Sequence, residues 1–304
     1  METLLTPAAP IPEDLHRWAE QHLPGATRAT DTSWPRGTSQ VWRVDGESTS
    51  VYAKISPSRR AFEREIHAHR HARAALPPTA APRLIAYDTR TLALLTTAVP
   101  GAVVRGLPLD PDIETRVHHL GGTLLRGWHD HPETAPEGAR KEVTASMTAQ
   151  AAEAALCLKA TEELLHPDER ELVAEVAHDL VALAAGLPLV YLHGDAAPRN
   201  WLWDQVTTTL ALIDFETAEH GLAVQDMIWL RGALWPSQPH LREAYLDGYG
   251  RPLTDDEQRL LLLLTARLAV SYLTTGLRNQ DQILIDRGRT ALGDLVRTRR
   301  CASA

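Results

Sequence analysis

The sequence predicts an α+β fold of two lobes, in which a strand-rich lobe is followed by a mainly helical one. Short β-prone runs are concentrated before residue 100, and long Ala- and Leu-rich helical stretches follow it. Between the two regions, the apolar run Leu92–Val99 ends at the helix- and strand-breaking pair Pro100-Gly101. The 304 residues, of which 44% are hydrophobic, are enough for two modest cores. We therefore place an N-terminal lobe at residues 1–98, a hinge at about residues 95–101 and a C-terminal lobe at residues 102–304.

The elements of the N-terminal lobe follow from spacing and composition. Apolar residues recur at helical spacing between Ile11 and Leu23, which predicts an amphipathic first helix. Residues 34–44 read as a turn between strands, and Val51–Ile55 is a short β-prone run. A helical stretch, Arg59–Ala75, comes next. The lobe thus combines a sheet with at least one packed helix.

The C-terminal lobe is expected to consist mainly of helices at residues 112–129, 145–165 and 167–185. A polar, breaker-rich loop at residues 131–138 separates the first two. Two strand-like runs, Trp201–Trp203 and Leu210–Ile213, flank a polar turn and predict a hairpin. Thr254 and Glu257 have the spacing of a capping box, which predicts the start of a further buried helix.

One short segment carries the chemistry. His193-Gly194-Asp195 is followed by Asn200 five residues after the aspartate, and the return strand of the hairpin delivers Asp214. Such a loop, with a second aspartate brought back beside the asparagine, supplies the parts that phosphoryl transfer from Mg-ATP requires. Asp195 is the predicted catalytic residue, which orients the attacking hydroxyl. Asn200 and Asp214 offer hard oxygen atoms and are the predicted Mg²⁺ ligands.

With His-Gly-Asp where protein kinases have His-Arg-Asp, and Asp-Phe-Glu where they have Asp-Phe-Gly, the chain resembles the aminoglycoside phosphotransferase and choline kinase family. The resemblance implies a bilobal protein-kinase-like fold, with an antiparallel sheet plus helix in the small lobe and a mainly helical large lobe. It implies ATP as the phosphate donor with Mg²⁺, and some members use GTP. It also implies a structural role for Asp226, as a support of the catalytic loop; helix capping by this carboxylate is an equally sufficient reading.

The same resemblance assigns nucleotide-binding residues to the N-terminal lobe. Lys54 lies near the end of a strand similar to the Val-Ala-Ile-Lys strand of kinases, and would bind the nucleotide phosphates. Glu65 is the preferred partner of Lys54, with Glu63 as the alternative. The turn containing Gly37, Thr38 and Ser39 would cover the phosphates with backbone amides. At the hinge, the backbone of Thr96 and Ala98 would read the adenine edge.

Composition and charge restrict the partners. The formal net charge of −8 argues against nucleic acid and is compatible with a cationic small molecule. Cys157 and Cys301 are far apart and form no metal-type pair. No basic, then apolar, N-terminal segment is present, so we expect a cytoplasmic protein. The apolar run Leu260–Leu264 is too short to span a membrane.

The acceptor is the open question, because a fold does not specify it. By resemblance we expect an aminoglycoside or a basic cyclic peptide antibiotic, phosphorylated to give resistance. Four carboxylates are candidates for binding such a cation: Glu216, Asp247, Asp281 and Asp286. The alternatives are a metabolite kinase for choline, homoserine or methylthioribose, and a nucleotide-binding pseudokinase. The complete set of Lys54, Asp195, Asn200 and Asp214 speaks against the last. Monomer and dimer both remain open.

Overall fold

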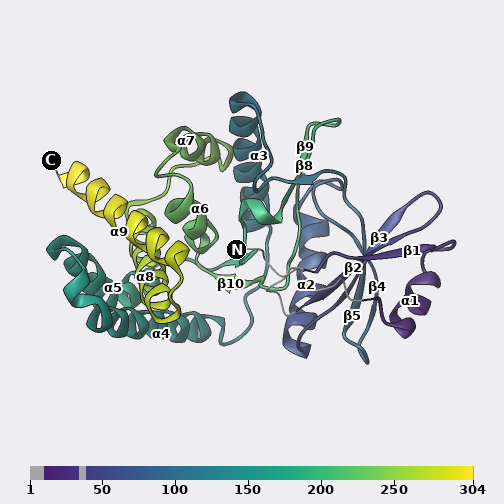
Figure 1. Ribbon diagram of the computed structural model, residues 1–304, viewed down its shortest axis with the longest axis horizontal. Coiled ribbons are helices and arrows are strands. Elements are labelled where there is room, and N and C mark those ends of the chain that lie inside the picture. The colour runs from purple at the N-terminus through teal and green to yellow at the C-terminus, as the bar shows by residue number, and fades with distance from the viewer. Residues whose placement is uncertain (1–9, 34–38, 304) are drawn as a thin grey trace. The chain divides into compact units, whose positions relative to one another are not determined.

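The structure is a computed structural model that describes residues 10–33 and 39–303, with side chains described as far as Arg300. Its residues form two compact units (Figure 1). The first unit contains the residues up to Pro108 together with His193–Glu219, and the second contains Leu109–Leu192 and the residues from His220 onward. The predicted lobes, residues 1–98 and 102–304, were each one continuous stretch of chain, whereas both observed units are made of two stretches. The reason is that the catalytic loop and its hairpin pack within the first unit.

A five-stranded antiparallel sheet forms the body of the first unit, in the order β1-β2-β3-β5-β4. Its strands are β1 (Arg28–Asp31), β2 (Gln40–Asp45), β3 (Ser50–Ile55), β4 (Leu84–Asp88) and β5 (Ala93–Thr97). Helix α1 (Glu13–Glu20) covers one face, where its Leu15 and Ala19 pack with Trp42 and Ala53. Helix α2 (Arg59–Ala75) has the predicted bounds and supplies Phe62 and Ile66, which pack with Leu94.

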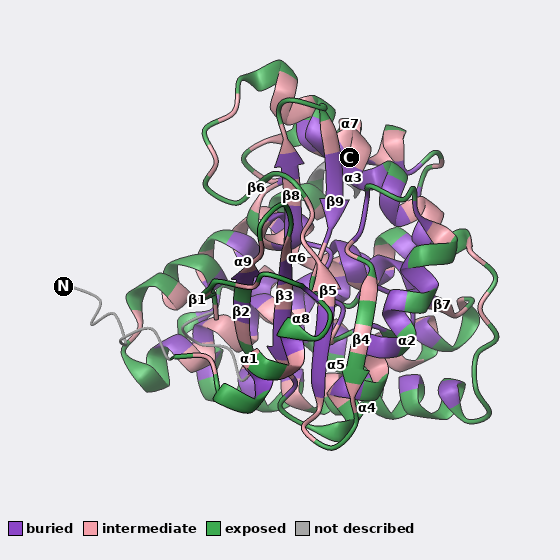
Figure 2. Cartoon of the chain, turned by 90° about the vertical axis from the view of Figure 1, so that its right-hand side faces the viewer, coloured by how far each residue is buried: buried purple, intermediate pink, exposed green. Residues whose placement is uncertain are grey.

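The predicted hairpin is present in the first unit as β8 (Trp201–Asp204) and β9 (Thr209–Leu212), with β6 (Ala102–Val103) on its other edge. Trp201 and Trp203 are buried, and Figure 2 shows both hairpin strands largely in the buried colour. The Leu212 amide donates to the Ala80 carbonyl at 2.9 Å. This bond ties the end of β9 to the segment that follows α2.

The second unit is mainly helical, and its described elements are α3 (Pro111–Asp130), α4 (Ala139–Thr161), α5 (Pro167–Gly186), α6 (Ile228–Ala233), α7 (Pro239–Gly248), α8 (Asp255–Asn279) and α9 (Gln282–Ser303), with short strands β7 (Val190–Leu192) and β10 (Glu219–Gly221). The predicted capping box is confirmed. Thr254 Oγ1 accepts from the Glu257 backbone amide at 3.2 Å, and the Glu257 carboxylate accepts from the Thr254 backbone amide at 2.9 Å. Helix α8 packs against α4, α5 and α9.

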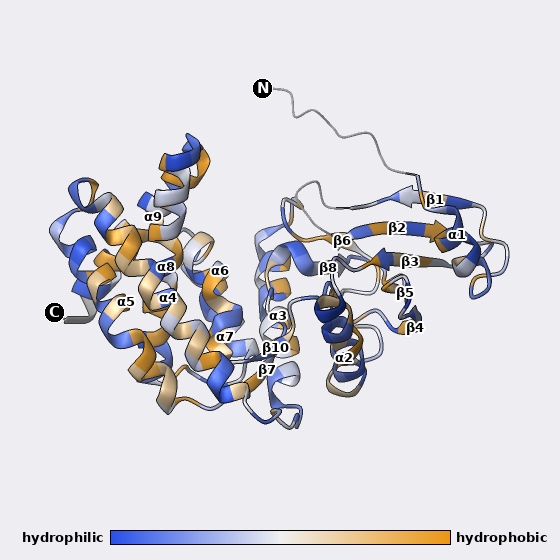
Figure 3. Ribbon diagram, turned by 90° about the horizontal axis from the view of Figure 1, so that it is seen from below, coloured by the Kyte–Doolittle hydropathy of each residue, from blue (hydrophilic) through white to orange (hydrophobic). Residues whose placement is uncertain are grey.

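Two features of α4 and α8 refine the predictions. Helix α4 begins at Ala139 rather than at residue 145. Its first turns bury only Ala139, Val143 and Met147, and the residues between them are polar or exposed, so the apolar spacing is weak. Helix α8 is long and apolar enough to cross a membrane, but 56% of its most apolar window is buried inside the protein. Figure 3 shows apolar segments recurring along α4, α5 and α8. Helix α8 is thus the core helix of the second unit.

Candidate active site

Lys54 is the centre of a cluster of charged side chains in the first unit. It lies on the face of the sheet that packs against α2, because its neighbour Ala53 belongs to the opposite face, covered by α1. The Lys54 ammonium is 3.0 Å from Glu65 Oε1, 2.9 Å from Asp214 Oδ1 and 3.0 Å from Glu216 Oε2. Glu65 is therefore the helix partner of Lys54. Glu63 is exposed and pairs with Arg59 at 3.6 Å instead.

The cluster has strongly perturbed electrostatics. Burial alone would lower the pKa of Lys54, but Glu65, Asp214 and Glu216 together raise it above its ordinary value, so the ammonium stays charged. Burial raises the pKa of the Glu65 carboxyl to about 7, although Lys54 acts in the opposite direction. His69 of α2 is buried near Lys54 and Asp214, and burial lowers the pKa of its imidazole to about 4. Its ring packs edge-on against Phe215, with centroids 5.0 Å apart.

Asp195 is held in the loop from several sides. The side-chain nitrogen of Asn200, Nδ2, donates to Asp195 Oδ2 at 2.7 Å and to the Asp195 carbonyl at 3.0 Å. Arg199 donates from Nε to Asp195 Oδ2 at 2.9 Å, and its terminal nitrogen bonds the other carboxylate oxygen. His193 is fully buried, and its Nδ1 accepts from the Asp195 amide at 3.3 Å. The carboxylate that would orient an acceptor is thus fixed before any substrate binds.

Sequence reasoning did not single out Arg199. The signal was available, because an arginine four residues after an aspartate in a tight loop has both the charge and the reach for a two-pronged ion pair. The contact was missed because the motif defines Asp195 and Asn200 and leaves the residues between them open.

Gly194 is required by the shape of this loop. Its backbone has φ +84°, in the left-handed region that favours glycine. A β-carbon at this position would lie 2.3 Å from the Thr217 carbonyl oxygen. The chain segments that follow His193 and Phe215 therefore approach closely only because residue 194 has no side chain.

Asn200 and Asp214 lie side by side at the open end of the hairpin. The Ile213 amide donates to the Asn200 carbonyl at 3.0 Å, and Asp214 has the unusual φ of +66° for a non-glycine residue. Because the Asn200 side-chain nitrogen bonds Asp195, its side-chain oxygen remains for a metal ion. Asp214 uses one carboxylate oxygen for Lys54 and is partly exposed. This set of hard oxygen donors fits Mg²⁺.

The predicted phosphate and adenine contacts have mixed outcomes. Gly37 and Thr38 lie outside the described residues, whereas Ser39 donates its hydroxyl to Glu216. Thr96 lies within β5, opposite Tyr52. The Ala98 amide donates to the Ser50 carbonyl at 3.2 Å, so the sheet uses the group that we assigned to the adenine edge. That assignment needs correction, because the ladder of β3 and β5 extends one residue beyond Thr97.

The four carboxylates predicted to bind a cationic acceptor have separate roles. Glu216 belongs to the Lys54 cluster. Asp247 is exposed and lies 3.0 Å from His119. Asp281 caps α9, since its Oδ1 accepts from the Ile283 amide at 3.1 Å and the Leu284 amide at 3.3 Å. Asp286 accepts from Gln282 at 2.8 Å on an exposed helix face. Asp281 thus has a sufficient structural role without any ligand.

Asp226 is buried in the second unit, where its Oδ2 is 3.0 Å from His129 Nε2. The other ring nitrogen of His129 is 2.9 Å from the Tyr249 hydroxyl. The N-cap residue of α6 is Met227 and not Asp226. Capping by this carboxylate and support of the catalytic loop both stay predictions. His129 thus links Asp226 to Tyr249 through its two ring nitrogens.

A sheet with a buried lysine–glutamate pair, joined to a loop that presents Asp195, Asn200 and Asp214, defines a kinase-like phosphotransferase. The model of the phosphotransferase enzyme family matches residues 33–263, and the chain belongs to this family. No curated protein matches the chain.

Solved structures with the same fold include antibiotic phosphotransferases. The ternary complex of APH(2'')-IIa with streptomycin and ATP has a TM-score of 0.65 at 14% identity, covering 93% of this chain and 96% of that one. Spectinomycin phosphotransferase APH(9)-Ia, in complex with ADP and spectinomycin, has a TM-score of 0.59 at 14% identity, with coverage of 94% and 93%. Macrolide 2'-phosphotransferase MphH from Brachybacterium faecium has a TM-score of 0.57 at 19% identity, with coverage of 92% and 98%. The predicted kinase-like α+β fold is confirmed.

Proposed function

We propose that this protein transfers the γ-phosphate of Mg-ATP to a hydroxyl group of a small-molecule antibiotic. The observation that carries the proposal is the joint placement of the Lys54–Glu65–Asp214 cluster and of the Asp195–Asn200 pair within one compact unit. These are the groups needed to hold phosphates and to orient an acceptor.

The roles follow from the contacts. Lys54 stays protonated and would bind the phosphates, while Glu65 holds its ammonium in place. Asn200 and Asp214 would hold Mg²⁺, which when bound neutralises charge on the nucleotide phosphates. Asp195 would accept a hydrogen bond from the acceptor hydroxyl and direct its oxygen at the phosphorus. Its carboxylate is held ready for that by Asn200 and Arg199.

The antibiotic acceptor is supported by the structural neighbours, several of which are complexes with streptomycin, gentamicin or spectinomycin. That the antibiotic is a cation remains a prediction from the sequence. Glu216 contacts Lys54 and Asp281 caps α9, so these two carboxylates do not support it further. Choline, homoserine and methylthioribose remain the alternative acceptors. We also propose a cytoplasmic location, where ATP is available.

The deciding experiment measures ADP release from Mg-ATP across aminoglycosides, macrolides, basic peptide antibiotics and the three metabolites. With the acceptor so found, Asp195→Ala should lower kcat by a factor of at least about 100 while nucleotide affinity is kept. Asp214→Ala should lose Mg-dependent nucleotide binding as well. Asp112→Ala, on an exposed helix surface, is the matched control and should behave as the parent. Normal turnover in Asp195→Ala would refute the assignment.

A further inference from the structure

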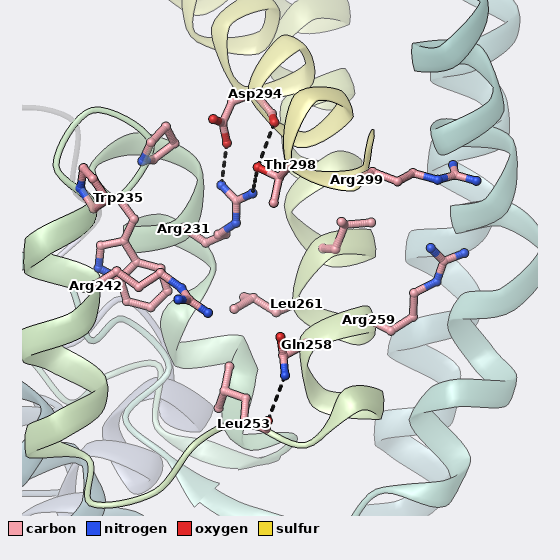
Figure 4. A pocket seen from close by; sticks show the side chains of 13 residues that line it. Arg231, Trp235, Arg242, Leu253, Gln258, Arg259, Leu261, Asp294, Thr298 and Arg299 are labelled. Atoms are coloured by element: carbon pink, nitrogen blue, oxygen red, sulfur yellow. Dashed lines mark hydrogen bonds and ion pairs between the residues drawn. The ribbon is translucent and has the colours of Figure 1, made fainter. Parts of the chain in front are cut away.

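A pocket of about 610 Å³ lies in the second unit among α6, α7, α8 and the C-terminal part of α9 (Figure 4). This volume is in the range of sites for small organic molecules. Part of its wall is apolar and includes Trp235, Leu253 and Leu261. The charged part contains one carboxylate, Asp294, and four arginines, Arg231, Arg242, Arg259 and Arg299. We call it the arginine pocket.

Two of the four arginines are neutralised outside the pocket. Arg259 pairs with Glu175 of α5 and lies 3.5 Å from Asp179. Arg299 pairs with Glu175 at 2.5 Å and lies 3.5 Å from Glu171, so three carboxylates face the two guanidinium groups. Figure 4 shows the guanidinium groups of both turned away from Arg231 and Arg242. Their aliphatic stems line the wall, but their charges are already compensated by α5.

The other two arginines leave an excess of positive charge. Arg231 donates to Asp294 at 2.7 Å and to Thr298 at 3.2 Å. Arg242 is half-buried and makes no hydrogen bond or ion pair with any described residue. Burial, and then the charge of Arg231, lower the pKa of the Arg242 guanidinium, while Glu243 acts in the opposite direction. A half-buried positive charge without an ion-pair partner favours the approach of an anion.

Trp235 provides a second observation on the same wall. Its side chain is buried, and its indole N–H has no hydrogen-bond acceptor among the described residues. This nitrogen is itself inaccessible to solvent, so among the described residues the pocket presents one unpaired donor, Arg242, beside an apolar surface to which the Trp235 ring contributes.

We infer that the arginine pocket binds a small organic anion, with an apolar body against Leu261 and Trp235 and a carboxylate or phosphate group beside Arg242 and Arg231. The planar guanidinium matches either group through paired hydrogen bonds. Because α5 compensates two of the four wall arginines and Asp294 compensates Arg231, the excess charge is the guanidinium of Arg242, which has no ion pair among the described residues and disfavours a cation. The inference is independent of the acceptor phosphorylated by the enzyme.

Calorimetric titration of the full chain with phenyl phosphate, benzoate and benzylamine tests this site. Mg-ADP is added to occupy the nucleotide site, so that phenyl phosphate does not compete there. We expect both anions to bind and benzylamine, a cation of similar size, not to bind. The affinity ratio of phenyl phosphate to benzoate then separates a phosphate site from a carboxylate site. Arg242→Gln should weaken anion binding at least tenfold.

The matched control is Arg278→Gln, which removes an exposed arginine of α8 that has no ion pair among the described residues. It should bind the anions as the parent does. A second measurement follows the ¹⁵N-labelled indole signals, with that of Trp235 identified in Trp235→Phe; phenyl phosphate should shift this signal. Equal anion affinity in Arg242→Gln and the parent, benzylamine binding as tight as benzoate, or an unmoved Trp235 signal would overturn the inference.

Discussion

Lys54 neutralises only part of the negative charge gathered around it. Its ammonium contacts three carboxylates, those of Glu65, Asp214 and Glu216. When all three are ionised, the cluster has two negative charges in excess. A divalent cation compensates such an excess, which agrees with the oxygen donors of Asn200 and Asp214. Charge balance thus supports the same metal assignment as the donor geometry.

The first residue-scale prediction compares two neighbouring glutamates. Glu65→Gln should lower kcat/KM for the nucleotide at least about tenfold, because it removes the buried charge that holds Lys54, whereas exposed Glu63→Gln should change little. Because the pKa of Glu65 is raised to about 7, its charged form is lost as pH falls below that value. kcat/KM in the parent should therefore rise with pH through about 7. Steady-state kinetics between pH 5.5 and 8.5 check both expectations, and an unchanged rise in Glu65→Gln would contradict the assignment.

The second concerns Arg199. Its two-pronged contact holds the Asp195 carboxylate, so Arg199→Ala should lower kcat roughly tenfold, or about 1.4 kcal/mol, with little change in the KM for the nucleotide. Arg199→Lys keeps the charge but loses the fork and should recover only part of the activity. Initial rates at saturating nucleotide give the comparison. A purely structural role would instead lower the melting temperature of both variants and leave kcat intact in the folded fraction.

At the scale of elements, periodicity and motif spacing were sufficient for α2, the catalytic hairpin and the cap of α8. They failed where the determining contact is distant in sequence. Glu216 joins Lys54 across 162 positions of chain, and linear spacing does not report such a contact. The Ala98 amide was misassigned because the last bond of a ladder depends on how far both strands extend. Local signals thus predicted elements and motif residues, but not the partners of those residues.

The element-scale prediction concerns the start of α8. Thr254→Ala should destabilise the protein by about 1 kcal/mol, because the Glu257 amide loses its capping oxygen at the start of the core helix. Thr148→Ala is the matched control, since Thr148 is exposed within α4 and its hydroxyl only bonds the Thr144 carbonyl. Thermal unfolding followed by circular dichroism gives the comparison. Equal melting temperatures for Thr254→Ala and the control would show that the capping box does not contribute.

For the whole molecule, two buried histidines link stability to pH. Burial lowers the pKa of His69 in the first unit and of His118 in the second to about 4 each. Their unfolded-state pKa is near 6.5, so between pH 6.5 and 4 the unfolded chain binds protons that the folded chain does not. Stability should therefore fall as pH decreases through this window, by about 2 kcal/mol per histidine at pH 5. The contribution is fully present above pH 6.5.

Denaturant unfolding at pH 7 and pH 5 measures this effect. His118→Gln should show a smaller loss between the two pH values than the parent, whatever its stability at pH 7. His178→Gln, at an exposed position of α5, should keep the full loss. An identical pH dependence in His118→Gln and the parent would show that His118 is already protonated in the folded state.

The discontinuous make-up of the first unit has a consequence for biosynthesis. Its sheet is encoded before residue 109, but Phe215, which packs on His69, and Leu212, which bonds Ala80, come after residue 192. At typical translation rates, the ribosome needs roughly 4–17 s to make the intervening stretch. During that interval the nascent sheet and α2 lack the segment that completes them, and their apolar surface is open to chaperones and to misfolding. The first unit, which contains Lys54 and Glu65, therefore cannot fold completely until the catalytic loop has been synthesised.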